Sequence, residues 1–222
     1  MSLVPTSTVG RKILMAVTGQ MMLLFVIIHL LGNTTIYFSS LNAYAAALHA
    51  LPALLGMIRL FMVAMLCFHI YFGIVVTLEN KKAKPQSYAV TNHLSTSFAG
   101  RNMIWTGSLI GAFLVYHLLH FTFQIVDPSA AAVRNPDALG RPDVLLMVVR
   151  SFQDIGIVSL YVTSVAGLLL HLSHGIQSSF QTWGLNTDRS LPVFVKAGTA
   201  TAVILFLGYA AIPIVIVAGF LK

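Results

Sequence analysis

Five long apolar segments, separated by short polar ones, divide the chain. Each apolar segment is at least about 20 residues long, which is the length that crosses a bilayer as an α-helix. The pattern predicts spans at roughly 13–38, 56–78, 102–125, 145–179 and 193–220. We therefore expect an all-α integral membrane bundle of five transmembrane helices, with residues 1–222 forming a single transmembrane domain.

The connecting segments hold the turn residues and most of the charges. Residues 39–55 are mildly apolar and are expected to include a short helix in the membrane interface. Residues 126–144 contain the turn signals Asp127-Pro128 and Asn135-Pro136. The segment 145–179 is longer than a bilayer requires, so the ends of its helix should protrude from the membrane.

The composition supports a membrane protein with little soluble structure. The chain is 57% apolar and 9% charged, whereas soluble domains carry about 25% charged residues. The net charge of +7 comes from loop residues, so it indicates topology and no nucleic-acid partner. No cleavable signal peptide is expected, because no small-residue cleavage site follows the first apolar segment. The one cysteine, Cys67, excludes an intrachain disulfide, a cysteine-based zinc site and an iron–sulfur cluster in this chain.

Basic residues are divided unevenly between the two sides of the predicted bundle. Five spans place the termini on opposite sides, with eight basic residues on the N-terminal side and five on the other. The first group is Arg11, Lys12, Lys81, Lys82, Lys84, Arg101, Arg189 and Lys196, and the second is Arg59, Arg134, Arg141, Arg150 and Lys222. Because cytoplasmic loops carry the excess of Lys and Arg, we predict a cytoplasmic N-terminus.

Two short patterns, each containing a histidine, occur twice inside the apolar segments. Thr18-Gly19 is followed after nine residues by His29, and Thr106-Gly107 after nine residues by His117. The second pattern is a histidine followed four residues later by glycine, at His69 to Gly73 and His171 to Gly175. A titratable side chain is costly inside a bilayer, so four such histidines in an internal repeat indicate a function.

Counting along the helices places the four histidines at two depths. His29 and His117 lie about 25 and 24 Å from the cytoplasmic face, whereas His69 and His171 lie about 15 and 18 Å from it. The two levels are therefore on the order of 8 Å apart. Two imidazoles at each level fit the axial ligands of two bis-histidine b-type haems, so four of the five helices should enclose two haems.

Small and polar neighbours fit the same interpretation. Gly73 and Gly175 share a helix face with their histidines and would leave room for a porphyrin edge. Gly19 and Gly107 would let helices approach closely. The hydroxyls of Thr18 and Thr106 could reach a haem propionate or bond back to their own helix. The other possibility is that a histidine in a membrane helix only bonds a neighbouring carbonyl, but the repeat argues against this for all four.

The remaining histidines do not fit the repeat. His174 is expected to be a hydrogen-bonding neighbour near the cytoplasmic rim, and His120 lies deeper toward the outside, where it could be near a quinone. His49 and His93 are expected to be solvated loop residues.

At these residues the chain resembles a known family, the five-helix di-haem cytochrome b membrane anchor of succinate dehydrogenase and fumarate reductase. The likeness covers essentially the whole chain and rests on Phe25 to His29, His69 to Gly73, Val115 to His117, His171 to Gly175 and Trp183-Gly184. The family pattern has one ligand in each of the first four helices. The resemblance implies that His69 and His171 hold the inner haem, and that His29 and His117 hold the outer one.

The resemblance also implies partners and a location. A flavoprotein subunit with FAD and an iron–sulfur subunit would dock on the cytoplasmic face of a bacterial inner membrane. This chain would pass electrons between them and a membrane quinone, with menaquinone the expected type. FAD and iron–sulfur clusters would belong only to those partner subunits.

The chain also departs from the family pattern. Some fumarate reductases have a glutamate two residues before the ligand of the fourth span, where this chain has Leu169. Residues 37–58 contain no Asp or Glu that could serve a quinone on the outer side. The candidates for quinone contacts are His120, Asn33, Gln124 and His49, and the arginines considered for propionates are Arg101, Arg150 and Arg189.

Two other functions are also compatible with the sequence. The first is a di-haem cytochrome b anchor serving a hydrogenase or formate dehydrogenase, which would differ in its partner subunits. The second is a transporter that uses intramembrane histidines for protons, which would bind no haem.

Overall fold

The computed structural model describes residues 7–83 and 97–221. The predicted loop residues Lys84, Pro85 and His93 lie outside this part of the chain, as does Lys222.

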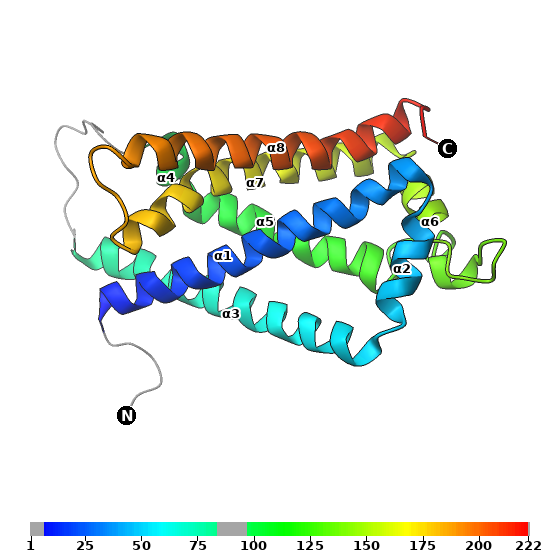
Figure 1. Ribbon diagram of the computed structural model, residues 1–222, viewed down its shortest axis with the longest axis horizontal. Coiled ribbons are helices and arrows are strands. Elements are labelled where there is room, and N and C mark those ends of the chain that lie inside the picture. The colour runs from blue at the N-terminus through cyan, green and yellow to red at the C-terminus, as the bar shows by residue number, and fades with distance from the viewer. Residues whose placement is uncertain (1–6, 84–96, 222) are drawn as a thin grey trace.

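The described residues form helices and no strand (Figure 1). Five of these helical segments are long and apolar enough to cross a membrane, which confirms the predicted all-α, multi-pass architecture. They are α1 (Thr8–Asn33) with the 3-10 turn η1 (Thr34–Phe38), α3 (Pro52–Ala83), α5 (Met103–His117) with η2 (Leu118–Thr122), α7 (Ile155–Thr182) and α8 (Leu191–Val217). The shorter helices are α2 (Leu41–His49), α4 (Phe98–Arg101), α6 (Val144–Ser151) and the 3-10 turn η3 (Ala132–Arg134).

The predicted helix over 145–179 is wrong in one respect, because the structure divides it into α6 and α7. Asp154 begins α7 by accepting hydrogen bonds from the backbone nitrogens of Gly156 and Ile157, at 2.7 and 3.1 Å. A carboxylate at this position satisfies nitrogens that have no partner within a helix. The chain can therefore turn between Phe152 and Asp154, and α6 is a separate short helix at the end of the bundle (Figure 1).

The third span ends in a short π-helix. The α-helical part of α5 stops at His117, and Leu118–Thr122 continue with the wider π-helical turn. This change in pitch affects residues that follow His117, among them the buried His120. Such π segments are frequently found at functional sites.

The long helices pack around α7. Helix α8 runs beside α7, while α1 and α5 also pack on α7 and α3 packs on α1 (Figure 1). Close packing depends on glycine at two positions of α8: a Cβ atom on Gly198 would lie 3.3 Å from Ile176, and one on Gly208 would lie 2.7 Å from Leu30. The Tyr209 hydroxyl also donates a 2.6 Å hydrogen bond to the Val26 carbonyl, which joins α8 to α1.

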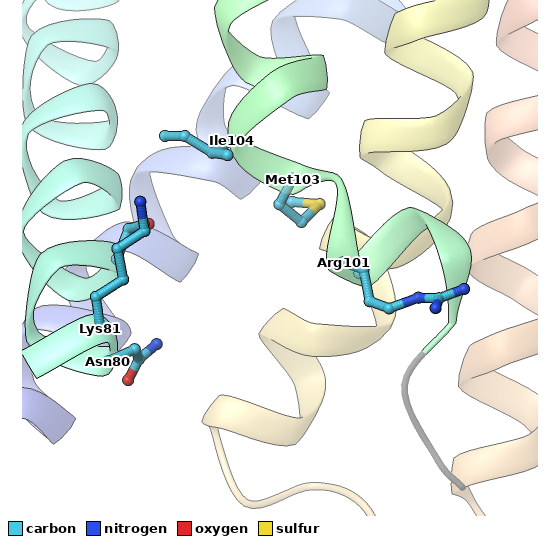
Figure 2. Close-up of a pocket in the computed structure, with 7 residues that line it drawn as sticks. Asn80, Lys81, Arg101, Met103 and Ile104 are labelled. Atoms are coloured by element: carbon cyan, nitrogen blue, oxygen red, sulfur yellow. The ribbon is translucent and has the colours of Figure 1, made fainter. Parts of the chain in front are cut away.

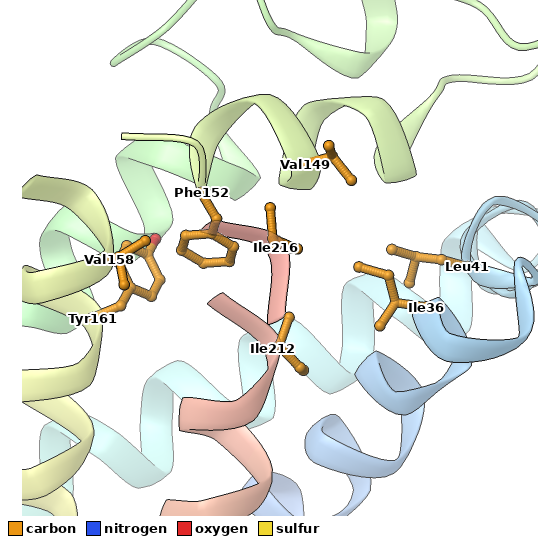
Figure 3. Close-up of a cluster of buried hydrophobic side chains, with 8 residues drawn as sticks. All are labelled: Ile36, Leu41, Val149, Phe152, Val158, Tyr161, Ile212 and Ile216. Carbon is orange, nitrogen blue, oxygen red and sulfur yellow. The ribbon is translucent and has the colours of Figure 1, made fainter. Parts of the chain in front are cut away.

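The two ends of the bundle differ in how they are closed. At the end where α1 begins, which we call the N-terminal end, Arg11 of α1 forms an ion pair with Glu79 of α3. We call the opposite end the α6 end, because α2 and α6 cover it (Figure 1). A buried apolar cluster there joins residues of η1, α2, α6, α7 and α8 (Figure 3). It consists of Ile36, Leu41, Val149, Phe152, Val158, Tyr161, Ile212 and Ile216.

Hydrogen bonds to Asn42 hold the short helices of the α6 end in place. Its side-chain nitrogen donates to Asp143 Oδ1 at 2.9 Å, and its side-chain oxygen accepts from the Leu145 nitrogen at 2.8 Å. Asp137 in the adjoining loop is also near Asn42, at 3.4 Å. Hydrogen bonds from Arg141 lower the pKa of the Asp137 carboxyl to about 2, so this acid stays ionised within the loop.

Candidate functional site

The structure brings the four repeat histidines together in two pairs. The ring centroids of His29 and His117 are 6.0 Å apart, with ring planes at 88°. Those of His69 and His171 are 6.2 Å apart, with ring planes at 67°. We call these the outer pair and the inner pair. The pairing is the one predicted from the sequence, and each pair joins a helix of the first repeat to a helix of the second.

These separations fit two imidazoles that share one metal ion. A bond between a metal and an imidazole nitrogen is about 2.0 Å long, and a ring centroid lies about 1.1 Å beyond its nitrogen, so two rings on opposite sides of a metal have centroids about 6.2 Å apart. Both pairs have this spacing. Across residues 7–83 and 97–221 no three His, Cys, Asp or Glu side chains gather as a metal site. A metal held here would therefore take its other ligands from a cofactor, as haem iron does.

A hydrogen bond to the backbone indicates which ring nitrogen of His69 carries the proton. Its Nδ1 lies 3.1 Å from the Met15 carbonyl oxygen. A carbonyl only accepts, so Nδ1 carries the proton and Nε2 keeps a lone pair. Histidines that ligate metals generally donate their other N–H to a carbonyl or carboxylate in this way.

The two repeat threonines contact the inner pair. Thr106 Oγ1 lies 3.1 Å from His171 Nδ1, and Thr18 Oγ1 lies 3.4 Å from His69 Nδ1. Each threonine hydroxyl also donates to the backbone carbonyl four residues earlier in its own helix, at 2.8 Å for Thr18 and 3.1 Å for Thr106. The predicted bond of each threonine to its own helix is thus present. Because the hydroxyl hydrogen is already donated, the oxygen is free to accept the Nδ1 proton of a histidine.

The glycines beside these threonines give the inner histidines their space. A Cβ atom on Gly19 would lie 3.1 Å from His69 Cε1, and one on Gly107 would lie 3.5 Å from His171 Cε1. A Cβ atom on Gly73 or Gly175 would in turn meet Met15 or Met103, at 4.0 and 3.9 Å. The two sequence patterns therefore form one structural unit: the Thr-Gly of one helix contacts the histidine of the next.

The two pairs are further apart than counting from the loops suggested. The inner pair contacts Thr18 and Thr106, which precede His29 and His117 by eleven residues. Eleven residues span about 16 Å of helix, compared with the expected 8 Å or so. The starting levels of the count were sound, because Arg11 at the start of α1 pairs with Glu79 of α3. Equal counts along these two helices therefore do not correspond to equal depths.

The outer pair has a different set of polar neighbours, which the sequence did not reveal. The Tyr161 hydroxyl lies 3.4 Å from His117 Nδ1 and 3.0 Å from His120 Nδ1, and His120 Nε2 lies 3.1 Å from Ser151 Oγ. His120 is 3% exposed, so it lies inside the protein. The sequence carries only a weak signal for this set, because Ser151 and Tyr161 are two of many polar side chains in segment 145–179.

The other residues considered for a quinone are separate from one another. Asn33 donates a 2.8 Å hydrogen bond to the His29 carbonyl. His49 is exposed, and its Nδ1 lies 2.8 Å from the Ala45 carbonyl. Gln124 has a φ of 55°, and its Oε1 is the buried side-chain oxygen that finds no partner in the described chain. His174 contacts Ser97 and Gln177 near the N-terminal end, as expected for a hydrogen-bonding neighbour.

Two of the three arginines considered for propionates lie at the N-terminal end of the bundle. Arg101 lines a pocket of about 360 Å³ between α3 and the start of α5, together with Lys81, Asn80, Thr77 and Met103 (Figure 2). Met103 is also the residue nearest to Gly175, so the pocket is close to the inner pair. Arg189 is exposed in the loop between α7 and α8, and Arg150 is exposed at the end of α6.

Comparisons with known proteins do not identify a family for this chain. No family model, curated protein or solved structure matches the chain.

Proposed function

We propose that the chain is the membrane anchor and electron-transfer subunit of a succinate:quinone oxidoreductase, with two bis-histidine b haems. The proposal rests above all on the two imidazole pairs, with centroids 6.0 and 6.2 Å apart. Helix packing does not by itself require four histidines from four helices to form two pairs, each at the distance at which two imidazoles can bind one metal ion. The resemblance of the sequence to the di-haem anchors supports the same function.

Each group of residues has a role in this proposal. His69 and His171 hold the inner haem, His29 and His117 hold the outer haem, and the bound haems supply one-electron transfer across the membrane. Two imidazoles bound to one haem iron would leave no position open for oxygen, so oxygen chemistry is not expected. The inner histidines are oriented by Thr18, Thr106 and the Met15 carbonyl.

The pocket lined by Lys81 and Arg101 fits the carboxylates of the inner haem. Both side chains are cationic: Lys81 lies on α3, and Arg101 lies at the end of α4, where its guanidinium points away from Lys81 and would turn toward the pocket to bind a carboxylate (Figure 2). Guanidinium and ammonium groups form strong charge-assisted hydrogen bonds with carboxylates. We therefore assign the propionates of the inner haem to this pocket, which opens at the N-terminal end.

The same end is where partner subunits would dock. An iron–sulfur subunit on the cytoplasmic face would exchange electrons with the inner haem, and a flavoprotein with FAD would interconvert succinate and fumarate. The outer haem would exchange electrons with a quinone, for which we propose menaquinone. We propose that the chain lies in a bacterial inner membrane with its N-terminus in the cytoplasm.

The haem assignment is tested by replacing the histidines one at a time with alanine. The purified wild-type protein should contain two haems per chain with b-type reduced-minus-oxidised spectra. His29→Ala and His117→Ala should each remove the outer haem, and His69→Ala and His171→Ala the inner one, so that each variant keeps about half the haem. His174→Ala is the matched control and should keep both. A wild-type protein without haem, or four variants with full haem content, would refute the proposal.

The partner assignment needs a separate experiment. Purification of the complex under mild detergent should recover a flavoprotein and an iron–sulfur subunit, and succinate should reduce the haems. Recovery of hydrogenase or formate dehydrogenase subunits would instead identify the related anchor. A haem-free chain that moves protons alone would identify a transporter.

A further inference from the structure

The hydrogen bonds around His120 run in a single direction. Ser151 Oγ donates to the Met147 carbonyl at 2.8 Å, so this oxygen accepts the proton of His120 Nε2. His120 Nδ1 is then the acceptor for the Tyr161 hydroxyl, at 3.0 Å. The Tyr161 oxygen can therefore only accept from His117 Nδ1, at 3.4 Å. Every step follows from the one before, because a carbonyl oxygen cannot donate.

This chain of polar groups is closed to water and rigid. Ser151 and His120 are each 3% exposed and Tyr161 is 7% exposed. The ring of Phe121 stacks on His120, with centroids 4.1 Å apart, and Phe152 packs edge-on against Tyr161. Buried polar groups are costly unless every one is bonded, and a fully bonded network holds its members in one arrangement.

The consequence for His117 is a defined protonation of its ring. The proton is on Nδ1, and the lone pair is on Nε2, which is the nitrogen free to bind a metal. The inner histidines reach the same state through the Met15 carbonyl and the threonine hydroxyls. Among the described residues no threonine contacts the outer pair in this way, and the Tyr161 hydroxyl takes the corresponding position beside His117 Nδ1.

We propose that Tyr161, held by His120 and Ser151, is the positioning residue of the outer pair: it fixes the tautomer and orientation of His117 and strengthens the electron donation of its Nε2. This inference rests on the proposed function, because the electron donation acts on the iron of the outer haem. An acceptor at Nδ1 makes an imidazole a stronger ligand, which favours oxidised iron and lowers the potential of the haem.

The test compares Tyr161→Phe with Thr106→Val, which removes the corresponding hydroxyl at the inner pair. Redox titration of the purified holoprotein should show a more positive midpoint potential for the outer haem in Tyr161→Phe, with the inner haem unchanged. Thr106→Val should show a more positive midpoint potential for the inner haem, with the outer haem unchanged. Loss of the outer haem to an apo-globin scavenger should be about 10-fold faster in Tyr161→Phe. The electron paramagnetic resonance signal of the outer haem should change in the same variant.

Ser151→Ala gives an independent measurement if Tyr161→Phe does not fold. It removes the acceptor for His120 and should move the outer potential in the same direction by a smaller amount. The inference is overturned if the outer potential and resonance signal stay at their wild-type values in these variants, or if both haems shift equally. A wild-type protein without haem would instead refute the proposed function, so the two failures are distinguishable.

Discussion

At the scale of single residues, the positions of the inner histidines depend on the missing side chains of two glycines and on the hydroxyl oxygens of two threonines. Gly19 and Gly107 have no Cβ, and the imidazoles of His69 and His171 occupy the space beside them. Thr18 and Thr106, the neighbouring residues, supply the oxygens that face Nδ1. The Thr-Gly pairs are therefore contact surfaces for the next histidine in the chain, in addition to allowing the helices to approach closely.

Substitution of these two glycines by alanine should have unequal effects. Gly19→Ala brings a methyl group to 3.1 Å from a ring that the Met15 carbonyl already holds, whereas Gly107→Ala stays at ordinary contact distance. Overpacking in a rigid site costs about 1–3 kcal/mol. We expect Gly19→Ala to unfold at lower temperature and to alter the inner haem spectrum, and Gly107→Ala to leave both near wild type.

Gly56→Ala is the control for helix propensity, because nothing lies within 4 Å of the added methyl group. Thermal unfolding in detergent measures all three variants. Equal losses in Gly19→Ala and Gly56→Ala would contradict the contact with His69.

At the scale of helices, the hydrophobic pattern predicted the spans well and their ends poorly. The apolar segment 145–179 is continuous in hydropathy, but Asp154 accepts two backbone hydrogen bonds there and begins a new helix. The π-helical turn after His117 has no signal in an apolar segment, because hydropathy does not depend on pitch. The pairing of the histidines was predictable, since it follows from repeat order and approximate depth. Tyr161 was not, because hydropathy does not indicate which polar side chain of segment 145–179 faces His117.

The connection between α2 and α6 should depend strongly on Asn42. Asn42→Ala removes the hydrogen bonds to Asp143 and to the Leu145 nitrogen and leaves those groups without these partners. Loss of a partner for a buried polar group costs about 1–3 kcal/mol, so the unfolding temperature should fall. Asn102→Ala is the control, because the Asn102 side chain bonds only to the Phe98 carbonyl of its own turn among the described residues. Equal unfolding temperatures for the two variants would show that Asn42 does not hold α2 to α6.

At the scale of the whole molecule, the charges predict the orientation of the bundle. The start of α1, the end of α3 and the loop between α7 and α8 lie at one end, with Lys81, Lys82 and Arg189 (Figure 1). The loop with Asp137 lies at the other end, near α6. The five spans give this division, and the excess of basic residues predicts that the first end is cytoplasmic.

Cysteine labelling in spheroplasts tests this orientation. In a Cys67→Ser background, a cysteine at Ala138 should react with a membrane-impermeant maleimide in intact spheroplasts. A cysteine at Thr187 should react only after the membrane is permeabilised. Labelling in the opposite order would reverse the orientation and would move the docking face for partner subunits to the other side.

The arrangement of the two histidine pairs has a consequence for the molecule as a unit. Each pair takes one ring from α1 or α3 and the other from α5 or α7, so neither half of the chain contains a complete site. Helices α3 and α5 hardly touch, and their halves are joined mainly through α1, α7 and α8. The chain thus contains two helical hairpins, α1 with α3 and α5 with α7, and a group bound between the rings of both pairs would also join the two hairpins.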